Sequence, residues 1–137
     1  MLKRTPLARK SKSEKAQRRD RIQALLRAIG IKRDGGCFLR NYSEAGACDQ
    51  ILQWDHLNSR AYSVSFGDSR LGVCVCRRHH IYWKPQHSAR YEICARDFIG
   101  TKRVVLLDRV REDRGVHKMD WKIVELSLEE ELNNMKK

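Results

Sequence analysis

The chain has 137 residues, a length that fits one domain rather than two. Its 29 Lys and Arg outnumber its 17 Asp and Glu, which gives a formal net charge of +12. No run of about 18 apolar residues is present, so we expect no membrane span. The basic N-terminus lacks the apolar stretch of a signal peptide, and we therefore expect an intracellular protein. In such a protein, five cysteines favour free or metal-bound thiolates over disulfides.

More than half of the excess positive charge lies at the N-terminus. Residues 1–21 hold nine Lys and Arg against Glu14 and Asp20, a net charge of +7. No apolar periodicity precedes Ser13, so we expect residues 1–12 to form a basic flexible arm and residues 13–137 to form one domain. Such an arm suits the phosphate backbone of nucleic acid, although a solvated tail or a contact with an acidic protein has the same composition.

Hydrophobic periodicity and turn residues divide the chain into short elements. We predict first a helix from Ser13 that stops at Gly30. The centre follows with a strand over residues 51–56, a Ser- and Gly-rich loop over 57–69, a strand over 73–76 and a helix from Arg77 that stops before Pro85. The last third is predicted to hold a helix from Ser88 to Gly100, a helix over 102–111, a strand over 121–126 and a final helix opened by a capping box at Ser127. This order predicts an α+β fold.

Four metal-ligand types lie in two distant pairs, which are Cys37 with Cys48 and Cys76 with His79. Two residues separate Cys76 from His79, a spacing that lets one turn present both side chains to one ion. Ten residues separate Cys37 from Cys48, so a loop must fold back to bring them together. Three thiolates and an imidazole suit a closed tetrahedral zinc site. Small buried thiols in a core are the alternative, and Cys74 is an alternative ligand.

A second set of residues suits phosphodiester hydrolysis. The reaction needs a water that loses its proton near neutral pH and a cation beside the phosphate. We assign His56 as the general base, and Asp55 and His80 as ligands of a divalent ion. Neighbours on a helix point about 100° apart, so His79 can face the zinc while His80 faces the second ion.

Two segments resemble the HNH nucleases, and most closely the small zinc-stapled type often encoded by bacteriophages. They are Trp-Asp-His at residues 54–56 and Gly-Val-Cys-Val-Cys-Arg-Arg-His-His at residues 72–80. The resemblance covers about residues 37–84. It implies a ββα-metal core with a structural zinc, flanked by helices, with residues 85–137 as a helical C-terminal extension. It also implies the ligand and base roles given above for the two sets of residues.

One position departs from the family. The middle Asn of the HNH motif, which braces the loop and orients the base, falls at Leu71. Its loss predicts weaker activity with metal binding retained, and we expect Asn58 to take over the bracing. Leu71 as an ordinary core residue in a shifted register is the other interpretation. The remaining substrate-binding assignments are phosphate contacts by Arg60, Arg77 and Arg78.

These features predict a metal-dependent DNA endonuclease of the HNH type that nicks one strand at a time. The expected cofactors are structural Zn²⁺ and catalytic Mg²⁺ or Mn²⁺, with Ni²⁺ or Zn²⁺ as alternatives. The expected partner is DNA, joined by packaging or recombination proteins in a bacterial cytoplasm if the chain is phage-encoded. The alternative function is a zinc-stabilised nucleic-acid-binding module with weak or no nuclease activity, which Leu71 favours. A third is a basic adaptor for RNA or an acidic protein, in which the thiols only pack.

Overall fold

The computed structural model describes residues 11–59, 62–113, 115 and 117–136. Its helices and strands are α1 (Glu14–Asp34), β1 (Leu52–His56), α2 (Ser63–Phe66), β2 (Gly72–Cys76), α3 (Lys84–Gln86), α4 (Ser88–Ile99), α5 (Thr101–Glu112) and α6 (Trp121–Met135). The fold is therefore α+β, as predicted. Residues 1–10 of the predicted arm and Arg60 lie outside the described residues.

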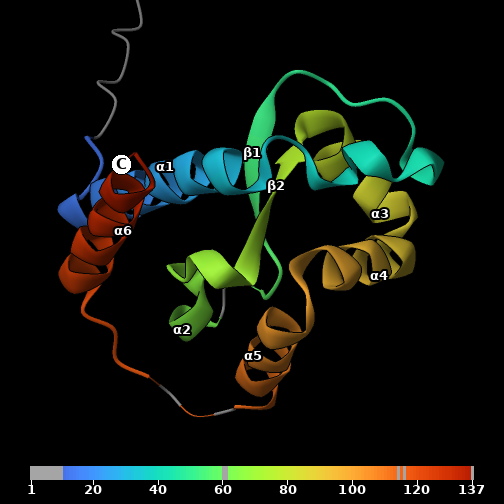
Figure 1. Cartoon of the computed structure of the whole chain (residues 1–137). Helices are drawn as coiled ribbons and strands as arrows, with labels where there is room; N and C mark the ends of the chain where they lie inside the picture. The colour runs from blue at the N-terminus through green and yellow to red at the C-terminus, as the bar shows by residue number, and fades with distance from the viewer. Residues whose placement is uncertain (1–10, 60–61, 114, 116, 137) are drawn as a thin grey trace, which may run out of the picture.

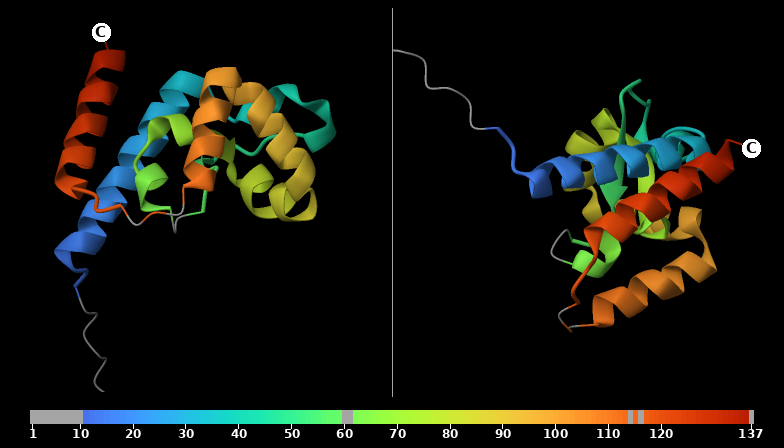
Figure 2. Two further views of the ribbon diagram at one scale, coloured as in Figure 1. Left: turned by 90° about the horizontal axis from the view of Figure 1, so that it is seen from below. Right: turned by 90° about the vertical axis from the view of Figure 1, so that its left-hand side faces the viewer.

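A hairpin of β1 and β2 lies at the centre of the fold (Figure 1). The strands are antiparallel, with Asp55 opposite Val73 and His56 opposite Gly72. Successive side chains of a strand point to opposite faces. Trp54 accordingly joins a hydrophobic cluster with α1 and α6, whereas Val73 joins a second cluster with α4 and α5. The hairpin thus separates two small cores, and the views in Figure 2 show α1 and α6 packed side by side.

Helix α1 is longer than predicted, because Gly30 lies inside it rather than at its end. The helix continues to Asp34 and stops at Gly35, whose φ of 74° is left-handed. Gly30 is buried, and a Cβ at this position would lie 2.9 Å from Cε3 of Trp54. The glycine therefore lets the indole ring of β1 approach the helix backbone, which is a packing role that periodicity does not reveal.

The strand predicted over residues 121–126 is wrong, and so is the capping box at Ser127. Both segments belong to α6, whose cap is Asp120: its carboxylate accepts hydrogen bonds from the backbone amides of Lys122 and Ile123. Ile123 is 60% exposed, which a buried strand would not allow. The residues that face α1 recur at helical spacing and are Trp121, Val124, Leu128, Leu132 and Met135.

The helix that follows β2 also runs further than predicted. A π-helical turn over His79–Trp83 leads directly into α3, and Pro85 lies in the first turn of α3, where a missing backbone amide is tolerated. Trp83 packs on the α4 and α5 side, and Tyr82 is 64% exposed. The predicted helices over 88–100 and 102–111 are confirmed as α4 and α5. Among the described residues, no helix has the length and apolar character needed to cross a bilayer.

Gly72 gives the first testable prediction, because a Cβ there would overlap the Trp54 indole and lie 2.8 Å from the Asp55 carbonyl oxygen. We expect Gly72→Ala to lower the free energy of unfolding by about 1–3 kcal/mol, the usual cost of overpacking a core. Urea denaturation measures this change. Gly115→Ala is the control, since its new Cβ would meet only exposed side-chain atoms. Equal stability of the two variants would contradict this packing.

Candidate functional site

Cys37, Cys48, Cys76 and His79 come together, with ligand atoms that all lie within 4.8 Å of one another. Nδ1 of His79 is 3.4 Å from Sγ of Cys37, 3.8 Å from that of Cys48 and 3.3 Å from that of Cys76. Zinc bonds of about 2.3 Å to sulfur and 2.0–2.1 Å to nitrogen place tetrahedral S and N ligands about 3.5 Å apart. The cluster therefore has the donor set and the spacing to hold a metal ion such as zinc.

Local structure explains why these four side chains converge. Cys76 ends β2 and His79 begins the π-helical turn, so one change of direction presents both ligands. The loop that holds Cys37 and Cys48 folds back over them, as the ten residues between the two cysteines require. Arg77 fixes that loop through ion-pair distances of 2.8 and 3.1 Å to Asp49, the residue that follows Cys48. The guanidinium of Arg77 is thus engaged beside the cluster.

His79 is held in the tautomer that a metal ligand needs. Its ring is fully buried, and Nε2 lies 2.9 Å from the carbonyl oxygen of Ala45. A carbonyl oxygen only accepts hydrogen bonds, so Nε2 carries the proton and Nδ1 directs its lone pair at the three sulfurs. A second hydrogen bond of this kind is typical of histidines that bind metals.

The thiols are poor anions without a cation. Burial raises the pKa of Cys37 to about 12, and burial also raises the pKa of Cys48. Zinc binds thiolates, so a bound ion must replace these protons. Cys74 is outside the cluster: it points to the α1 side, where its backbone amide donates to Asp34. Cys94 is buried in the core.

Asp55 and His80 also meet, at the junction of β1 and the π-helical turn. Oδ1 of Asp55 is 3.3 Å from Nε2 of His80, while Nδ1 of His80 is 2.8 Å from the side-chain oxygen of Gln53. Nδ1 donates to the amide oxygen, so that Nε2 is the ring nitrogen that faces the Asp55 carboxylate. One carboxylate and one imidazole in this arrangement suit a divalent cation.

The carboxylate of Asp55 already has charged and polar partners within the chain. The Lys84 ammonium lies 3.0 and 2.7 Å from its two oxygens, and the Tyr91 hydroxyl donates to Oδ2 at 2.6 Å. Burial raises the pKa of Asp55, but the hydrogen bonds and charges of His80, Lys84 and Tyr91 outweigh burial and lower the pKa to about 2. Asp55 is therefore an anion at neutral pH, as a metal ligand has to be.

His56 lies on the other face of β1 from Asp55. Its ring stacks on Phe66, with the ring centroids 4.8 Å apart and the planes 14° apart. Nε2 lies 3.0 Å from the Phe66 carbonyl oxygen, so Nε2 carries a proton and Nδ1 holds the basic lone pair of the neutral ring. Within the described residues, no group of three or more potential ligands includes His56, Asp55 or His80.

The loop after His56 is braced from α5. Arg111 donates to the Asn58 side-chain oxygen at 2.7 Å and to the Leu57 carbonyl at 2.8 Å. Asn58 is 4% exposed, and this contact is a structural one. Leu71, at the position of the family's Asn, is buried in the core cluster, consistent with the second interpretation of that residue.

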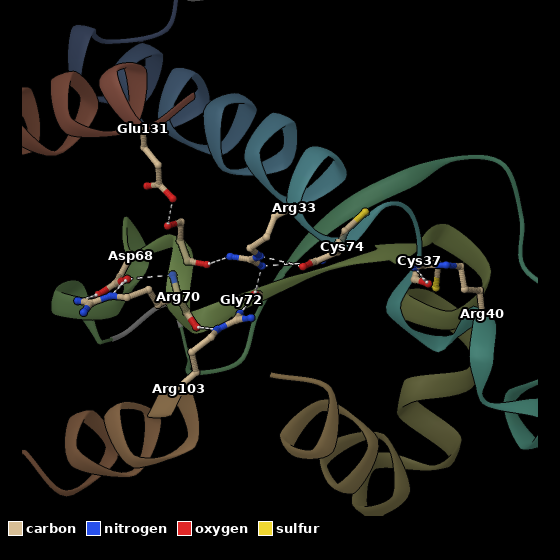
Figure 3. A network of polar contacts seen from close by, with 11 residues as sticks. Arg33, Cys37, Arg40, Asp68, Arg70, Gly72, Cys74, Arg103 and Glu131 are labelled. Atoms are coloured by element: carbon tan, nitrogen blue, oxygen red, sulfur yellow. Dashed lines mark hydrogen bonds and ion pairs between the residues drawn. The ribbon is translucent and has the colours of Figure 1, made fainter. Parts of the chain in front are cut away.

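Two further arginines hold the segment that leads into β2 (Figure 3). Arg33 of α1 and Arg103 of α5 donate to the Gly72 carbonyl oxygen at 3.0 and 2.7 Å. Arg103 also donates to the Arg70 carbonyl oxygen at 2.7 Å. Burial, together with the nearby charge of Arg33, lowers the pKa of Arg103 to about 10. These cations are structural. Arg78, an exposed residue among the predicted phosphate-binding arginines, donates to the Ala47 carbonyl oxygen at 3.3 Å.

Sequence reasoning missed the polar partners of the two sets of residues. Gln53, Lys84 and Tyr91 surround Asp55 and His80, and Phe66 holds His56. Nothing in the sequence around Tyr91 indicates that its hydroxyl reaches Asp55 of β1, 36 residues earlier. No family model, curated protein or solved structure is significantly similar to this chain.

We predict that the purified protein contains about one zinc ion per chain and that Cys76→Ser removes it. Loss of a ligand lowers the affinity for the ion, and a metal that binds only the folded state contributes directly to stability. Elemental analysis and thermal melting measure the two effects. Cys94→Ser is the matched control, because Cys94 is equally buried but lies outside the cluster. Equal metal content in both variants would show that the cluster does not bind the ion.

Asp55→Asn should lower the free energy of unfolding by about 1–3 kcal/mol at pH 7, since Asn leaves Lys84 without a counter-charge. This loss of stability is at the low end for buried ion pairs because 34% of the Lys84 side chain is exposed. The folded pKa is about 2 and the unfolded pKa about 3.9, so this stability is complete above about pH 5 and declines as the pH falls towards 2. Denaturant titrations between pH 7 and 3 should show the difference between the proteins narrowing below about pH 4. A difference that grew towards low pH would contradict this.

Proposed function

We propose that this protein is a metal-dependent DNA endonuclease of the HNH type. The observation that carries the proposal is the pairing of Asp55 and His80 at 3.3 Å, formed by residues of β1 and of the turn that follows β2. The same turn presents His79 to the thiol cluster. A strand, a strand and a helix that serve two ligand sets side by side are what the HNH resemblance implies, although the likeness covers only the central third of the chain.

In the proposed reaction, His56 acts as general base. His56 is the last residue of β1 and its ring lies on the face opposite to Asp55, so the scissile phosphate has to lie at the end of the strand to reach both. Its Nε2 is protonated and bonded to the Phe66 carbonyl, so Nδ1 is the atom that removes a proton from water. The water oxygen then bonds to phosphorus, and the bond from phosphorus to the 3′ oxygen breaks. Phe66 thereby takes the orienting role that the family gives to its middle Asn.

Asp55 and His80 would hold the divalent ion, which when bound supplies positive charge beside the phosphate. His80 is oriented for this by Gln53, and Asp55 is kept anionic by its neighbours. Lys84 is a resident cation at the same carboxylate, so a metal ion has to share or replace its contacts. One such site serves one strand, and we therefore propose nicking as the unit event.

The charge distribution supports DNA as substrate. The net charge is +12, and the first two turns of α1 present Lys15, Arg18 and Arg19. Cations on one helix neutralise phosphates without reading sequence, which predicts affinity that falls steeply with salt.

A zinc-stabilised binding module without nuclease activity is the second candidate. The observation in its favour is Lys84, whose ammonium contacts both oxygens of Asp55 and so competes for the place of an ion. Leu71 favours it as well, because the chain lacks the Asn of the HNH motif.

Nicking of supercoiled plasmid at low salt with Mg²⁺ or Mn²⁺ distinguishes the two. We expect the wild-type protein to produce open circles, and His56→Ala to be slower by about 10²–10⁴-fold, the usual contribution of a general base. His117→Ala is the matched control, since His117 is exposed, pairs with Asp113 and lies far from His56 in the sequence.

Equal nicking by the wild-type protein and His56→Ala would remove His56 from the role of base. A plasmid that is shifted on a gel but stays supercoiled with every protein and either ion would establish the binding module in place of the nuclease.

A further inference from the structure

A pocket of about 540 Å³ lies outside both ligand sets, where the N-terminal ends of α1 and α6 meet α2. Its volume is within the roughly 300–1,000 Å³ of sites that bind small organic groups. Its lining includes two aromatic residues, three cations and one carboxylate, which are Phe66, Trp121, Lys15, Arg18, Arg19 and Glu14. The lining therefore joins an aromatic wall to a cationic rim.

The aromatic wall is formed by Phe66 of α2 and Trp121 of α6. Their ring centroids are 5.8 Å apart and their planes are nearly perpendicular, at 89°. Phe66 is buried in the α1 and α6 cluster, while Trp121 is only partly buried. His56 stacks on the Phe66 ring and Arg19 lies over it, so Trp121 is the ring on which a planar group entering the pocket can stack. Nucleobases gain about 1–3 kcal/mol from such a contact.

The cationic rim comes from the first two turns of α1. The guanidinium of Arg19 lies over the Phe66 ring, 4.8 Å from its centroid. Nε of Arg18 is buried without a hydrogen-bond partner in the described part of the chain, and the Arg18 guanidinium forms ion pairs with Glu125 at 3.7 Å and Glu14 at 3.8 Å. Lys15 is exposed one turn earlier. Two guanidinium groups and an ammonium beside an apolar pocket suit a phosphate attached to a planar ring.

Phe66 connects this pocket with His56. One residue provides the pocket wall, stacks on the His56 ring and accepts the hydrogen bond from its Nε2. A group that binds against Phe66 is therefore held next to the residue that we assign as general base.

We propose that the pocket binds one unpaired nucleotide of DNA, with its base stacked on Trp121 beside Phe66 and its phosphate on Arg18 and Arg19. This inference rests on the proposed function and narrows its substrate to DNA in which a nucleotide has left the stack. A base inside a duplex cannot enter a pocket of this kind without leaving the helix, and a bulged or mismatched base does so at the least cost.

The test compares two duplexes that differ only in a single bulged 2-aminopurine nucleotide, in low salt and without added divalent ions. We expect wild-type protein to bind the bulged duplex about 5–150-fold more tightly by fluorescence anisotropy, the equivalent of one stacked base. Stacking on Trp121 should also quench 2-aminopurine fluorescence.

Three variants locate the effect. Arg18→Gln/Arg19→Gln should lose most of the preference for the bulge, and Trp121→Leu should lose the quenching. The matched control is Lys102→Gln/Arg109→Gln, which removes the same charge from exposed positions of α5 and should weaken binding of both duplexes alike. Circular dichroism verifies folding, and Trp121→Phe keeps an aromatic wall if Trp121→Leu unfolds.

Equal affinity for the two duplexes, or a bulge preference that survives the Arg18 and Arg19 changes, would overturn the pocket assignment and indicate another occupant, such as a peptide. The outcomes of this binding test can be distinguished from those of the plasmid-nicking test. Plasmid nicking without bulge preference would leave the nuclease and remove the pocket. Bulge preference and quenching without nicking would leave the pocket and remove the nuclease.

Discussion

The convergence of Cys76 and His79 with Cys37 and Cys48 is the constraint on which the rest of the structure depends. The protein has two small clusters on opposite faces of a two-stranded hairpin, and neither is large. A domain of this size gains much from a staple between distant segments. The four ligand atoms tie the loop after α1 to the end of β2 and to the turn beyond it. That turn has to be fixed for His80 to face Asp55.

Burial of the Asp55 carboxylate carries an energetic cost. A carboxylate that is 5% exposed loses most of its hydration, and three side chains from α3, α4 and the π-helical turn restore its charge balance. The contact with Lys84 allows two interpretations of Asp55. Its carboxylate is either an anion ready to bind a metal ion or one half of a closed ion pair with Lys84. The competition between an ammonium and a divalent ion for one carboxylate decides between nuclease and binding module.

Sequence alone predicted the hairpin and the four-ligand cluster because both depend on local spacing. Two residues separate Cys76 from His79, and only the loop closure to Cys37 and Cys48 required the fold. Sequence could not reveal that Gly30 accommodates Trp54, since a glycine near a predicted helix end has the same local signature as a cap. The strand prediction for residues 121–126 was wrong because a short apolar run fits the period of a strand as well as that of a helix. The packing of this segment against α1 decides for the helix.

The polar partners of Asp55 and His56 were out of reach for a related reason. Lys84 and Tyr91 follow Asp55 by 29 and 36 residues, and contacts over such separations leave no periodic trace. Phe66 is the same kind of case: a residue in a Ser- and Gly-rich segment proves to link the proposed base with the pocket beside α1 and α6.

The central claim is that one turn after β2 serves two ions, and anomalous diffraction from crystals grown with zinc and manganese tests it most directly. We predict zinc density bounded by the sulfurs of Cys37, Cys48 and Cys76 and by Nδ1 of His79, at about 2.3 Å from each sulfur. We predict separate manganese density at Asp55 and His80. Zinc located elsewhere, or manganese that leaves the Asp55 and His80 pair without density, would contradict the claim.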